Sequence, residues 1–227
     1  MFSQYSVQRF GEEQHPVVII DGFVPAPGKL AKLAGAQTFA AGGPYYPGIR
    51  APAPPEHLAP CGPVLEQVLR EVFGVRRGVR LTETNFSLVT TPPGELKLIQ
   101  RLPHFDSCDP DRFALLHYLS GTEFGGTGFY RHRATGFESL SAERLPAYES
   151  ALKEEVERLG PPPGGYLLGS TAQFEQIGQV EAAPNRAVLY AGRILHSGQI
   201  LKPEGLSSDP WNGRLTVNTF LESKDEA

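Results

Sequence analysis

The chain has 227 residues, of which 40% are hydrophobic and 20% are charged, and its formal net charge is −4. These values are typical of a single folded unit with a substantial core, and they argue against a disordered chain. The slightly acidic balance, without any run of Lys or Arg, excludes the electrostatic pattern of a nucleic-acid-binding protein. The longest apolar runs, such as Val17–Ile20, are far too short to span a bilayer, so no membrane segment is predicted.

The first residues, MFSQYSVQRFGEEQHP, lack the basic and apolar regions of a secretory signal, so we expect a cytoplasmic protein. The two cysteines, Cys61 and Cys108, are then expected to be free thiols. The spacing of Cys108 from His104 matches no Cys/His zinc pattern, which leaves this cysteine out of the predicted site.

In chain order, the first predicted element is a buried strand at 17–21, followed by a helix that begins near Pro27. Residues 41–60 contain so much Pro and Gly that we expect a long loop without regular structure. The apolar residues of 63–73 recur with helical spacing and Gly74 is a natural stop, so a second helix is expected there.

From residue 79 onward the pattern changes to strands. Alternating or β-branched segments predict strands within residues 79–90, 96–102, 111–120, 125–133, 172–182, 186–192, 194–200 and 214–221. Residues 141–159 instead predict a charged, mostly exposed helix with Ser141 as its N-cap. Because the strands follow one another without crossover helices, an antiparallel sandwich or barrel is favoured over a doubly wound sheet.

The stretch RLPHFDSCD, residues 101–109, contains His104 and Asp106 two positions apart. Taken alone, such a pair is more often an ordinary histidine beside an ordinary acid. However, residues i and i+2 of a strand point to one face, about 6–7 Å apart, so both side chains can converge on one ion. His196, which follows the strand RAVLYAG at the turn into a polar loop, offers a third ligand. Two imidazoles and one carboxylate form the facial triad of non-haem Fe(II) oxygenases.

In residues 85–221 the chain resembles the Fe(II)/2-oxoglutarate-dependent dioxygenase superfamily, most closely its prolyl-4-hydroxylase-like branch and bacterial relatives. The resemblance depends on five stretches that occur in the family's order: PHFD, ALLHYLS, GGTGFY, NRAVLYAGRILHSG and GRLTVNTFL. It implies a mainly β fold, a double-stranded β-helix (a cupin-like jelly roll), with an N-terminal α/β elaboration and one helical insertion. We expect one structural domain, in which a helical elaboration of residues 1–78 packs on a catalytic core of residues 79–227.

The resemblance also implies roles for individual residues. The implied metal ligands and catalytic residues are His104, Asp106 and His196. Arg214 would bind the distal carboxylate of 2-oxoglutarate, because a planar guanidinium forms a two-point, always-charged pair with a carboxylate. Thr216, two residues on, would face the same way. Tyr118 matches the tyrosine that reaches this carboxylate in the prolyl-hydroxylase branch.

One departure from the family pattern concerns the basic anchor on the last strand. The family places this residue closer to its distal histidine than the eighteen positions that separate Arg214 from His196. The intervening LKPEGLSSDPWNG is interpreted as an enlarged hairpin loop, which leaves the strand pairing intact. Lys202, at the start of this loop, is the competing anchor.

As the resemblance implies, the protein would hydroxylate or otherwise oxidise a C–H bond of a small molecule, such as an amino acid or a natural-product intermediate. Fe(II) would be the cofactor, dioxygen the oxidant and 2-oxoglutarate the co-substrate, decarboxylated to succinate. Halogenating members of the superfamily replace the ligand carboxylate by a small residue, so Asp106 favours hydroxylation. We expect no nucleic-acid or membrane partner, and the sequence is compatible with a homodimer.

The substrate itself is open at this point. Arg50, Arg131 and Arg133 suggest an anionic group on it, and His132 and Trp211 are further candidates for the substrate entrance. For each of these residues, packing on the core or exposure to solvent is an equal alternative. The alternative functions are a non-catalytic cupin-like metal-binding or sensing protein, an oxygenase acting on a peptide or protein side chain, and a metal hydrolase on the same scaffold.

Overall fold

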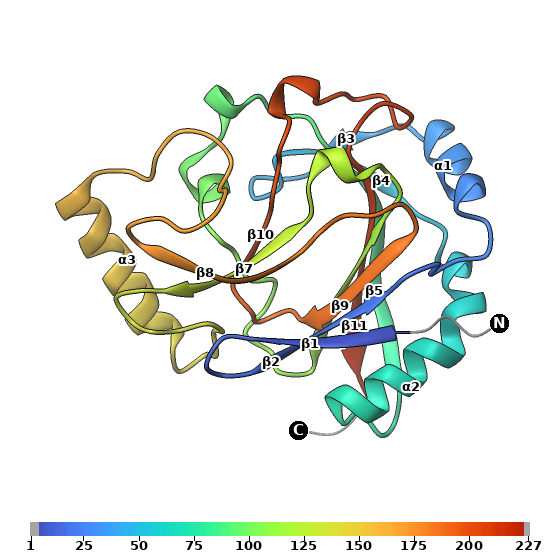
Figure 1. Cartoon of the computed structure of the whole chain (residues 1–227), viewed down its shortest axis with the longest axis horizontal. Helices are drawn as coiled ribbons and strands as arrows, with labels where there is room; N and C mark the ends of the chain where they lie inside the picture. Colours follow the sequence, from blue (N-terminus) through green and yellow to red (C-terminus); the bar gives the residue numbers. More distant parts are fainter. Residues whose placement is uncertain (1–4, 225–227) are drawn as a thin grey trace.

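The computed structural model describes residues 5–224 as an antiparallel β fold with three α-helices (Figure 1). The strands are β1 (Tyr5–Phe10), β2 (His15–Ile20), β3 (Ala40–Ala41), β4 (Gly48–Pro52), β5 (Val79–Val89), β6 (Arg112–Tyr118), β7 (Thr127–His132), β8 (Phe174–Val180), β9 (Arg186–Ala191), β10 (His196–Gly198) and β11 (Leu215–Ser223). The α-helices are α1 (Pro27–Gly35), α2 (Gly62–Phe73) and α3 (Leu145–Leu159). Short 3-10 helices are η1 (Pro55–Cys61), η2 (Pro93–Glu95), η3 (Leu98–Arg101), η4 (Thr122–Phe124) and η5 (Pro203–Gly205).

Two antiparallel sheets form the body of the protein. The large sheet has the order β1-β2-β9-β6-β11-β5-β4-β3, and the small sheet has the order β10-β7-β8. From β5 onward the chain changes sheet repeatedly: β5, β6, β9 and β11 lie in the large sheet, and β7, β8 and β10 lie in the small one. This alternation is the topology of a jelly roll and confirms the predicted mainly β, double-stranded β-helix class.

The large sheet is covered on both faces, which explains its nearly continuous apolar strands. In β2, Val18 and Ile20 join the core formed with α1 and α2, whereas Val17 and Ile19 join the core that faces the small sheet. Helix α3 packs instead with residues of the small sheet, in a third apolar cluster. Accordingly, α3 and the pair α1 and α2 lie at opposite ends of the view in Figure 1.

The prediction of an irregular loop over residues 41–60 is wrong in part. Gly48–Pro52 forms β4, which pairs with β5, and Ala40–Ala41 forms the edge strand β3. An edge strand needs only one ladder of backbone hydrogen bonds, so a segment rich in Pro and Gly can adopt it. The N-terminal residues thus extend the large sheet at both of its edges. The proposed boundary near residue 78 stays a prediction.

The strand predicted at residues 96–102 is also wrong, because this segment forms the 3-10 helix η3. The guanidinium of Arg101 donates hydrogen bonds to the carbonyl oxygen of Leu96, at 3.0 and 2.7 Å. The side chain of Gln100 accepts a hydrogen bond from the backbone N–H of Lys97. These local bonds turn the segment back on itself, and they satisfy its polar groups without a neighbouring strand.

Helix α3 begins at Leu145 rather than at the predicted residue 141. The hydroxyl of Ser141 accepts the N–H of Arg144, so it closes a turn ahead of the helix instead of capping it. Pro146 then lies in the first turn, where its missing N–H is tolerated. The helix is exposed along most of its length, but Tyr148 and Glu155 are buried.

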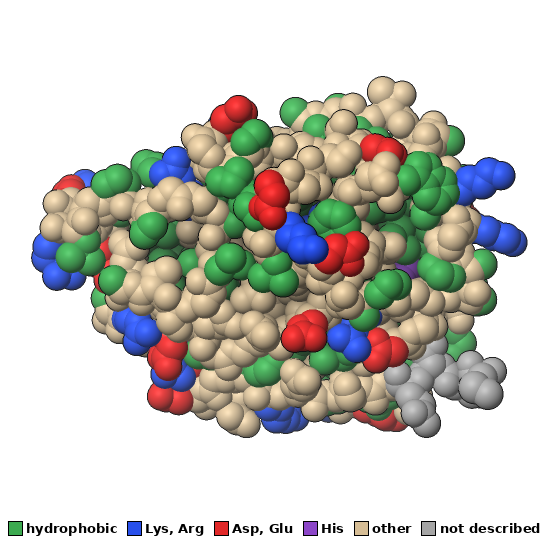
Figure 2. All heavy atoms as spheres, turned by 45° about the horizontal axis from the view of Figure 1, so that its top comes forward, with side chains coloured by type: hydrophobic (Ala, Val, Ile, Leu, Met, Phe, Trp, Pro, Cys, Tyr) green, Lys and Arg blue, Asp and Glu red, His purple; other side chains and the backbone are tan. Residues whose placement is uncertain are grey.

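The surface agrees with the mixed charge composition, since Figure 2 shows acidic and basic side chains interspersed over the face in view. Both cysteines are free thiols, as predicted. Cys61 is buried, and its Sγ donates to the carbonyl oxygen of Phe23 at 2.9 Å. Within residues 5–224, no helix has both the length and the apolar character needed to cross a bilayer.

Candidate active site

The backbone brings the HFD segment beside the strand that carries His196. His104 and His196 form an isolated antiparallel bridge, in which each N–H donates to the other's carbonyl oxygen at 2.8 Å. The N–H of Asp106 donates to the carbonyl oxygen of Gly192 at 2.7 Å. Residues 104–106 therefore continue the small sheet beyond β10. The predicted neighbourhood of the HFD segment and the distant histidine is present, although the expected full strand is reduced to a bridge.

The side chains of His104, Asp106 and His196 converge, with their ligand atoms all within 4.8 Å of one another. Nε2 of His196 lies 3.6 Å from Oδ2 of Asp106, and Nε2 of His104 lies 4.0 Å from Oδ1 of the same carboxylate. Nδ1 of His196 lies 2.8 Å from the carbonyl oxygen of Ile194. Since a carbonyl only accepts, this nitrogen carries the proton, and the lone pair of Nε2 is left for the centre of the cluster.

The electrostatics of this cluster suit metal ligation. Burial raises the pKa of Asp106, although His196, Arg112 and Arg50 act to lower it. Oδ2 of Asp106 is buried and has no hydrogen-bond partner among the described residues. Burial, followed by the repulsion of His196 and Arg50, lowers the pKa of His104 well below its usual value and favours the neutral imidazole. Its ring faces open cavity, so its side chain is 51% exposed even though protein surrounds the other sides.

A second group of possible ligands, Glu13, His15 and Glu138, lies at the turn between β1 and β2. Its carboxylates are already in use: Glu138 accepts bonds from Arg131 and from the backbone N–H groups of Glu12 and Glu13. Glu13 accepts bonds from the side chains of Ser139 and Arg144. This cluster is an ion-pair network that fastens the hairpin to the rest of the chain. The unpartnered Asp106 oxygen distinguishes the first group from it.

A cavity of about 650 Å³ opens beside His104, Asp106 and His196, large enough for a small molecule. Its floor is the face of the large sheet formed by alternate residues of β6 and β11, among them Ala114, Thr216 and Asn218. Apolar side chains from other segments line much of the remainder, including those of Ile99, Leu102, Phe105, Leu152 and Ile200.

Arg214 lies in this cavity and is only 4% exposed. One guanidinium nitrogen donates to the carbonyl oxygen of Gly126 at 3.0 Å, whereas Nε is buried without a partner in the part of the chain described. Thr216 also lines the cavity, and it pairs across the strands with Tyr118. The Tyr118 hydroxyl is 2.6 Å from that of Thr127, and the Arg214 guanidinium lies 5.8 Å from the Tyr118 ring centre. Lys202 is exposed on the loop after β10.

Of the five residues suggested for the substrate, the structure brings Arg50 alone to the cavity. Arg133 is exposed and donates to the carbonyl oxygen of Thr171. Arg131 is bonded to Glu138 and Glu175 in the ion-pair network. His132 is fully buried between Thr135 and Glu155, at 2.9 Å from each side chain. Trp211 is 62% exposed and lies near Gly35 of α1.

Tyr46, from the aromatic segment 41–60, also lines the cavity, and the structure adds three residues that the sequence patterns did not identify: Arg112, Tyr166 and Tyr190. Tyr190 lies edge-on to His196, with the ring centres 4.8 Å apart. The Tyr46 hydroxyl and the Arg112 Nε are both buried and unpartnered within residues 5–224. The aromatic content of residues 41–60 was the available signal for Tyr46, whereas Arg112 gave no signal, because its position depends on how β6 enters the sheet.

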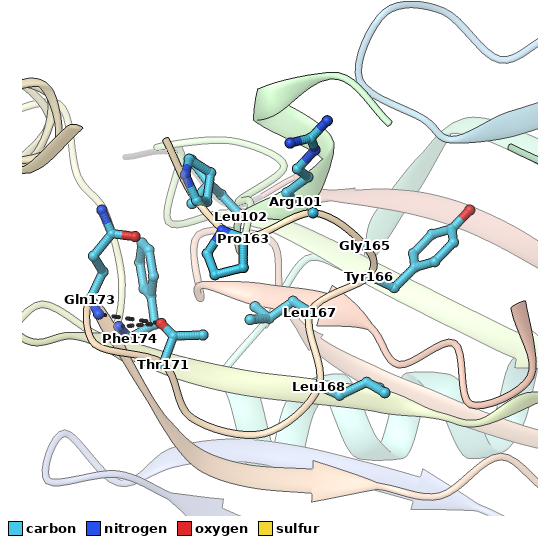
Figure 3. Close-up of a pocket in the computed structure, with 12 residues that line it drawn as sticks. Arg101, Leu102, Pro163, Gly165, Tyr166, Leu167, Leu168, Thr171, Gln173 and Phe174 are labelled. Carbon is cyan, nitrogen blue, oxygen red and sulfur yellow. Dashed lines mark hydrogen bonds between the residues drawn. The ribbon is translucent and has the colours of Figure 1, made fainter. Parts of the chain in front are cut away.

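A smaller pocket of about 160 Å³ adjoins the cavity and shares Leu102 and Tyr166 with it (Figure 3). Tyr166 and Leu167 point in opposite directions in this view. The Tyr166 hydroxyl donates to the carbonyl oxygen of Thr91 at 2.6 Å, which fixes this loop against the segment after β5. The hydroxyl of Thr171 accepts N–H bonds from Gln173 and Phe174 and closes the other side. The segment that forms the small pocket is therefore also a side wall of the main cavity.

Comparisons with known proteins support the architecture. A family model described as "Family of unknown function (DUF6445)" matches residues 2–221. A search of the curated proteins gives no match. Among solved structures, HygX from Streptomyces hygroscopicus with nickel, 2-oxoglutarate and hygromycin B bound is 13% identical, with a TM-score of 0.50, covering 93% of this chain and 84% of that one. The non-heme alpha ketoglutarate dependent epimerase SnoN from nogalamycin biosynthesis is 13% identical, with a TM-score of 0.50, covering 93% and 79%. At this identity the likeness shows a shared fold.

Proposed function

The chain belongs to the family of unknown function DUF6445, and from that starting point we propose that it is an Fe(II)/2-oxoglutarate-dependent oxygenase that oxidises a C–H bond of a small molecule. The observation that carries the proposal is the buried, unpartnered Oδ2 of Asp106, which lies between His104 and His196 at the edge of a large cavity. A buried carboxylate oxygen rarely stays unpaired, and a divalent cation is the natural partner for it beside two imidazoles.

His104, Asp106 and His196 would hold the iron on one side and leave the cavity side free. The proton on Nδ1 of His196 is fixed by the carbonyl of Ile194, which aims Nε2 at the metal position. Bound iron, 2-oxoglutarate and dioxygen would supply the oxidation, in which 2-oxoglutarate and the substrate each give two electrons, one oxygen atom enters succinate with loss of CO2, and the other enters the product.

Arg214 is the proposed anchor for the distal carboxylate of 2-oxoglutarate, with Thr216 beside it and Tyr118 behind it. Its buried Nε and its place in the cavity favour it over the exposed Lys202. Burial of a guanidinium without a neighbouring negative charge destabilises the fold, and an anionic ligand bound here would offset that loss of stability. The solved structures named above support 2-oxoglutarate as the co-substrate, since HygX was obtained with 2-oxoglutarate and nickel, and SnoN is described as alpha ketoglutarate dependent.

The test is anaerobic addition of Fe(II) and 2-oxoglutarate, followed by admission of dioxygen. We expect a weak visible charge-transfer band, then succinate formation, with loss of the band in His196→Ala and a strongly raised requirement for 2-oxoglutarate in Arg214→Gln. Glu13→Gln, in the second cluster of possible ligands, is the matched control and should keep the band. The proposal fails if the wild-type protein gives neither signal, or if the band survives in His196→Ala and is lost in Glu13→Gln.

A further inference from the structure

The cavity contains more positive charge than 2-oxoglutarate binding requires. Three guanidinium groups line it, those of Arg50, Arg112 and Arg214. Arg214 is assigned to the co-substrate in the proposed function. Arg50 comes from β4, near the edge of the large sheet, and Arg112 is the first residue of β6. Two arginines are therefore left in the space where the substrate would lie.

Arg50 is held in place but is not neutralised. Its guanidinium lies over the ring of Tyr46, 4.3 Å from the ring centre, which orients the group. Its Nε is buried and lacks a partner in the described part of the protein. The nearest acid, Glu83, is 4.0 Å away, at the outer limit of an ion pair, and its side chain is 44% exposed. The pair with Glu83 is thus weak, and the positive charge of Arg50 remains available to a ligand.

Arg112 has a similar environment at the other end of the sheet face. Its guanidinium lies 5.0 Å from the ring centre of Phe220, and its Nε is buried without a partner within residues 5–224. Aromatic support and an unpaired buried nitrogen therefore recur at both arginines. A planar guanidinium presented in this way matches a carboxylate, with which it can form two parallel hydrogen bonds.

The charges of the proposed cofactors do not use these two arginines. A divalent iron, the carboxylate of Asp106 and the dianion of 2-oxoglutarate together leave one negative charge, which Arg214 offsets. The other acid that lines the cavity is Glu149, an exposed residue of α3. Glu222, which lies opposite Arg112 on β11, is already paired with Arg80 at 2.8 Å, and Glu83 lies at the outer limit of an ion pair with Arg50. The two arginines therefore favour an anionic substrate over a neutral or cationic one.

The sheet register separates the two anion sites. Arg50 pairs with Ser87, Ser87 pairs with Thr216, and directly paired residues point to the same face. Neighbouring strands lie about 4.8 Å apart, so the Cα atoms of Arg50 and Thr216 are roughly 10 Å apart across the sheet. This distance leaves room for two separate carboxylates. Apolar side chains of the cavity, such as Ile99 and Leu152, would surround the rest of the substrate.

We propose that the substrate is a carboxylic acid with an apolar body. Its carboxylate is bound by Arg50, and the positive charge of Arg112 adds to the attraction. This inference rests on the proposed function for the placement of 2-oxoglutarate at Arg214. Arg50 is a binding residue that sets specificity, and it takes no part in holding the metal. The substrate would then extend from the β4 edge of the sheet toward His104 and Asp106.

The test measures binding of paired probes to protein loaded with Zn(II), which cannot turn over, and saturating 2-oxoglutarate. The probes are 3-phenylpropionate and its uncharged analogue 3-phenylpropionamide, titrated by calorimetry. We expect the wild-type protein to bind the carboxylate at least about tenfold more tightly than the amide. The amide lacks the negative charge that pairs with Arg50, and loss of such a charged hydrogen bond weakens binding by about tenfold or more. Arg50→Gln should abolish this preference, Arg112→Gln should reduce it, and the exposed control Arg133→Gln should keep it.

The inference is overturned if the wild-type protein binds both probes equally or neither of them, or if the preference persists in Arg50→Gln. The affinity for 2-oxoglutarate, measured separately in the wild-type protein and in Arg214→Gln, tests the proposed function. Failure of 2-oxoglutarate to bind, with an Arg50-dependent carboxylate preference retained, would reject the proposed function alone. Normal 2-oxoglutarate binding without that preference would reject the further inference alone.

Discussion

Buried polar atoms without partners gather around one cavity in this protein. The Tyr46 hydroxyl, the carboxylate Oδ2 of Asp106 and the Nε atoms of Arg50, Arg112 and Arg214 all lack a partner within residues 5–224. Folded proteins satisfy nearly all such groups, so five of them beside one cavity favour a ligand there; eight further atoms of this kind, such as Nε2 of His15 and Nδ1 of His117, lie elsewhere in the described residues. The HFD motif, the distant histidine and Arg214 could be identified from sequence order. Arg112 could not, because its place in the cavity depends on which strands the sheet brings together.

At Tyr46, removal of the hydroxyl should separate ligand binding from stability. Burial raises the pKa of Tyr46, so the hydroxyl keeps its proton and can donate to a carboxylate near Arg214. In Tyr46→Phe we expect the Kd for 2-oxoglutarate to rise about tenfold or more, because a hydrogen bond to a charged group contributes about 1.5–3 kcal/mol. The stability of the ligand-free protein should be unchanged or slightly higher. Tyr5→Phe is the control, since Tyr5 lies on β1 away from the cavity and its hydroxyl donates to Glu71. Equal affinities in both variants would contradict the assignment.

Among the elements, the strands with strongly apolar faces were predictable and those at the edges were not. Both faces of β6 and β9 are covered, so these strands consist mostly of apolar residues, which predict a buried strand. β1 is mostly exposed and β4 lies in a segment rich in Pro and Gly, so backbone pairing alone defines them. Residues 96–102 show the opposite error, because their alternation predicts a strand while the Arg101 side chain binds the backbone of its own segment. Local hydrogen bonds of this kind leave no periodic signal.

A buried polar contact adds to the apolar packing between helix α3 and the small sheet. Oε2 of Glu155 lies 2.9 Å from Nε2 of His132, and the two side chains are 9% and 0% exposed. Glu155→Ala should lower the free energy of unfolding by about 1–3 kcal/mol, because it leaves Nε2 of the buried His132 imidazole without a partner, while Nδ1 keeps its contact with Thr135. The neighbouring Glu154→Ala, on the exposed face, should change it by less than about 0.5 kcal/mol. Chemical denaturation of both variants measures the difference, and similar losses in the two would refute this role for Glu155.

The molecule as a whole encloses a neutral histidine within its large sheet. His117 is 1% exposed, packs edge-on against Phe23, and its Nε2 lies 3.0 Å from the side-chain oxygen of Asn185. Burial lowers the pKa of His117 to about 4, and nearby His57 acts in the same direction. The neighbouring Tyr118 faces the opposite side of the sheet, because consecutive residues of a strand point to opposite faces. Burial of His117 therefore links the stability of the entire fold to pH.

The sign of this link follows from the two protonation states. The unfolded chain takes up a proton at His117 below its ordinary pKa of about 6.5, whereas the folded protein does so only near pH 4. Stability is therefore fully present above pH 6.5 and is lost as the pH falls toward 4. Between pH 7 and 4.5, the wild-type protein should lose about 2–3 kcal/mol more than His117→Gln. Urea denaturation at several pH values measures this, and parallel pH profiles for the two proteins would refute it.

The cavity is assembled from two separate stretches of chain. Arg50 comes from β4, whereas the proposed iron ligands and Arg214 come from residues 104–214. The two stretches are joined through the backbone ladder between β4 and β5, which tolerates exchange of side chains. Selection can therefore alter the recognition half of the cavity while the oxidising half stays constant. For protein engineering, position 50 is the place where substitutions would redirect the proposed reaction to new acids, whereas Tyr46 and Gly48, whose backbone lies against the carbonyl oxygen of Leu88, have to be kept.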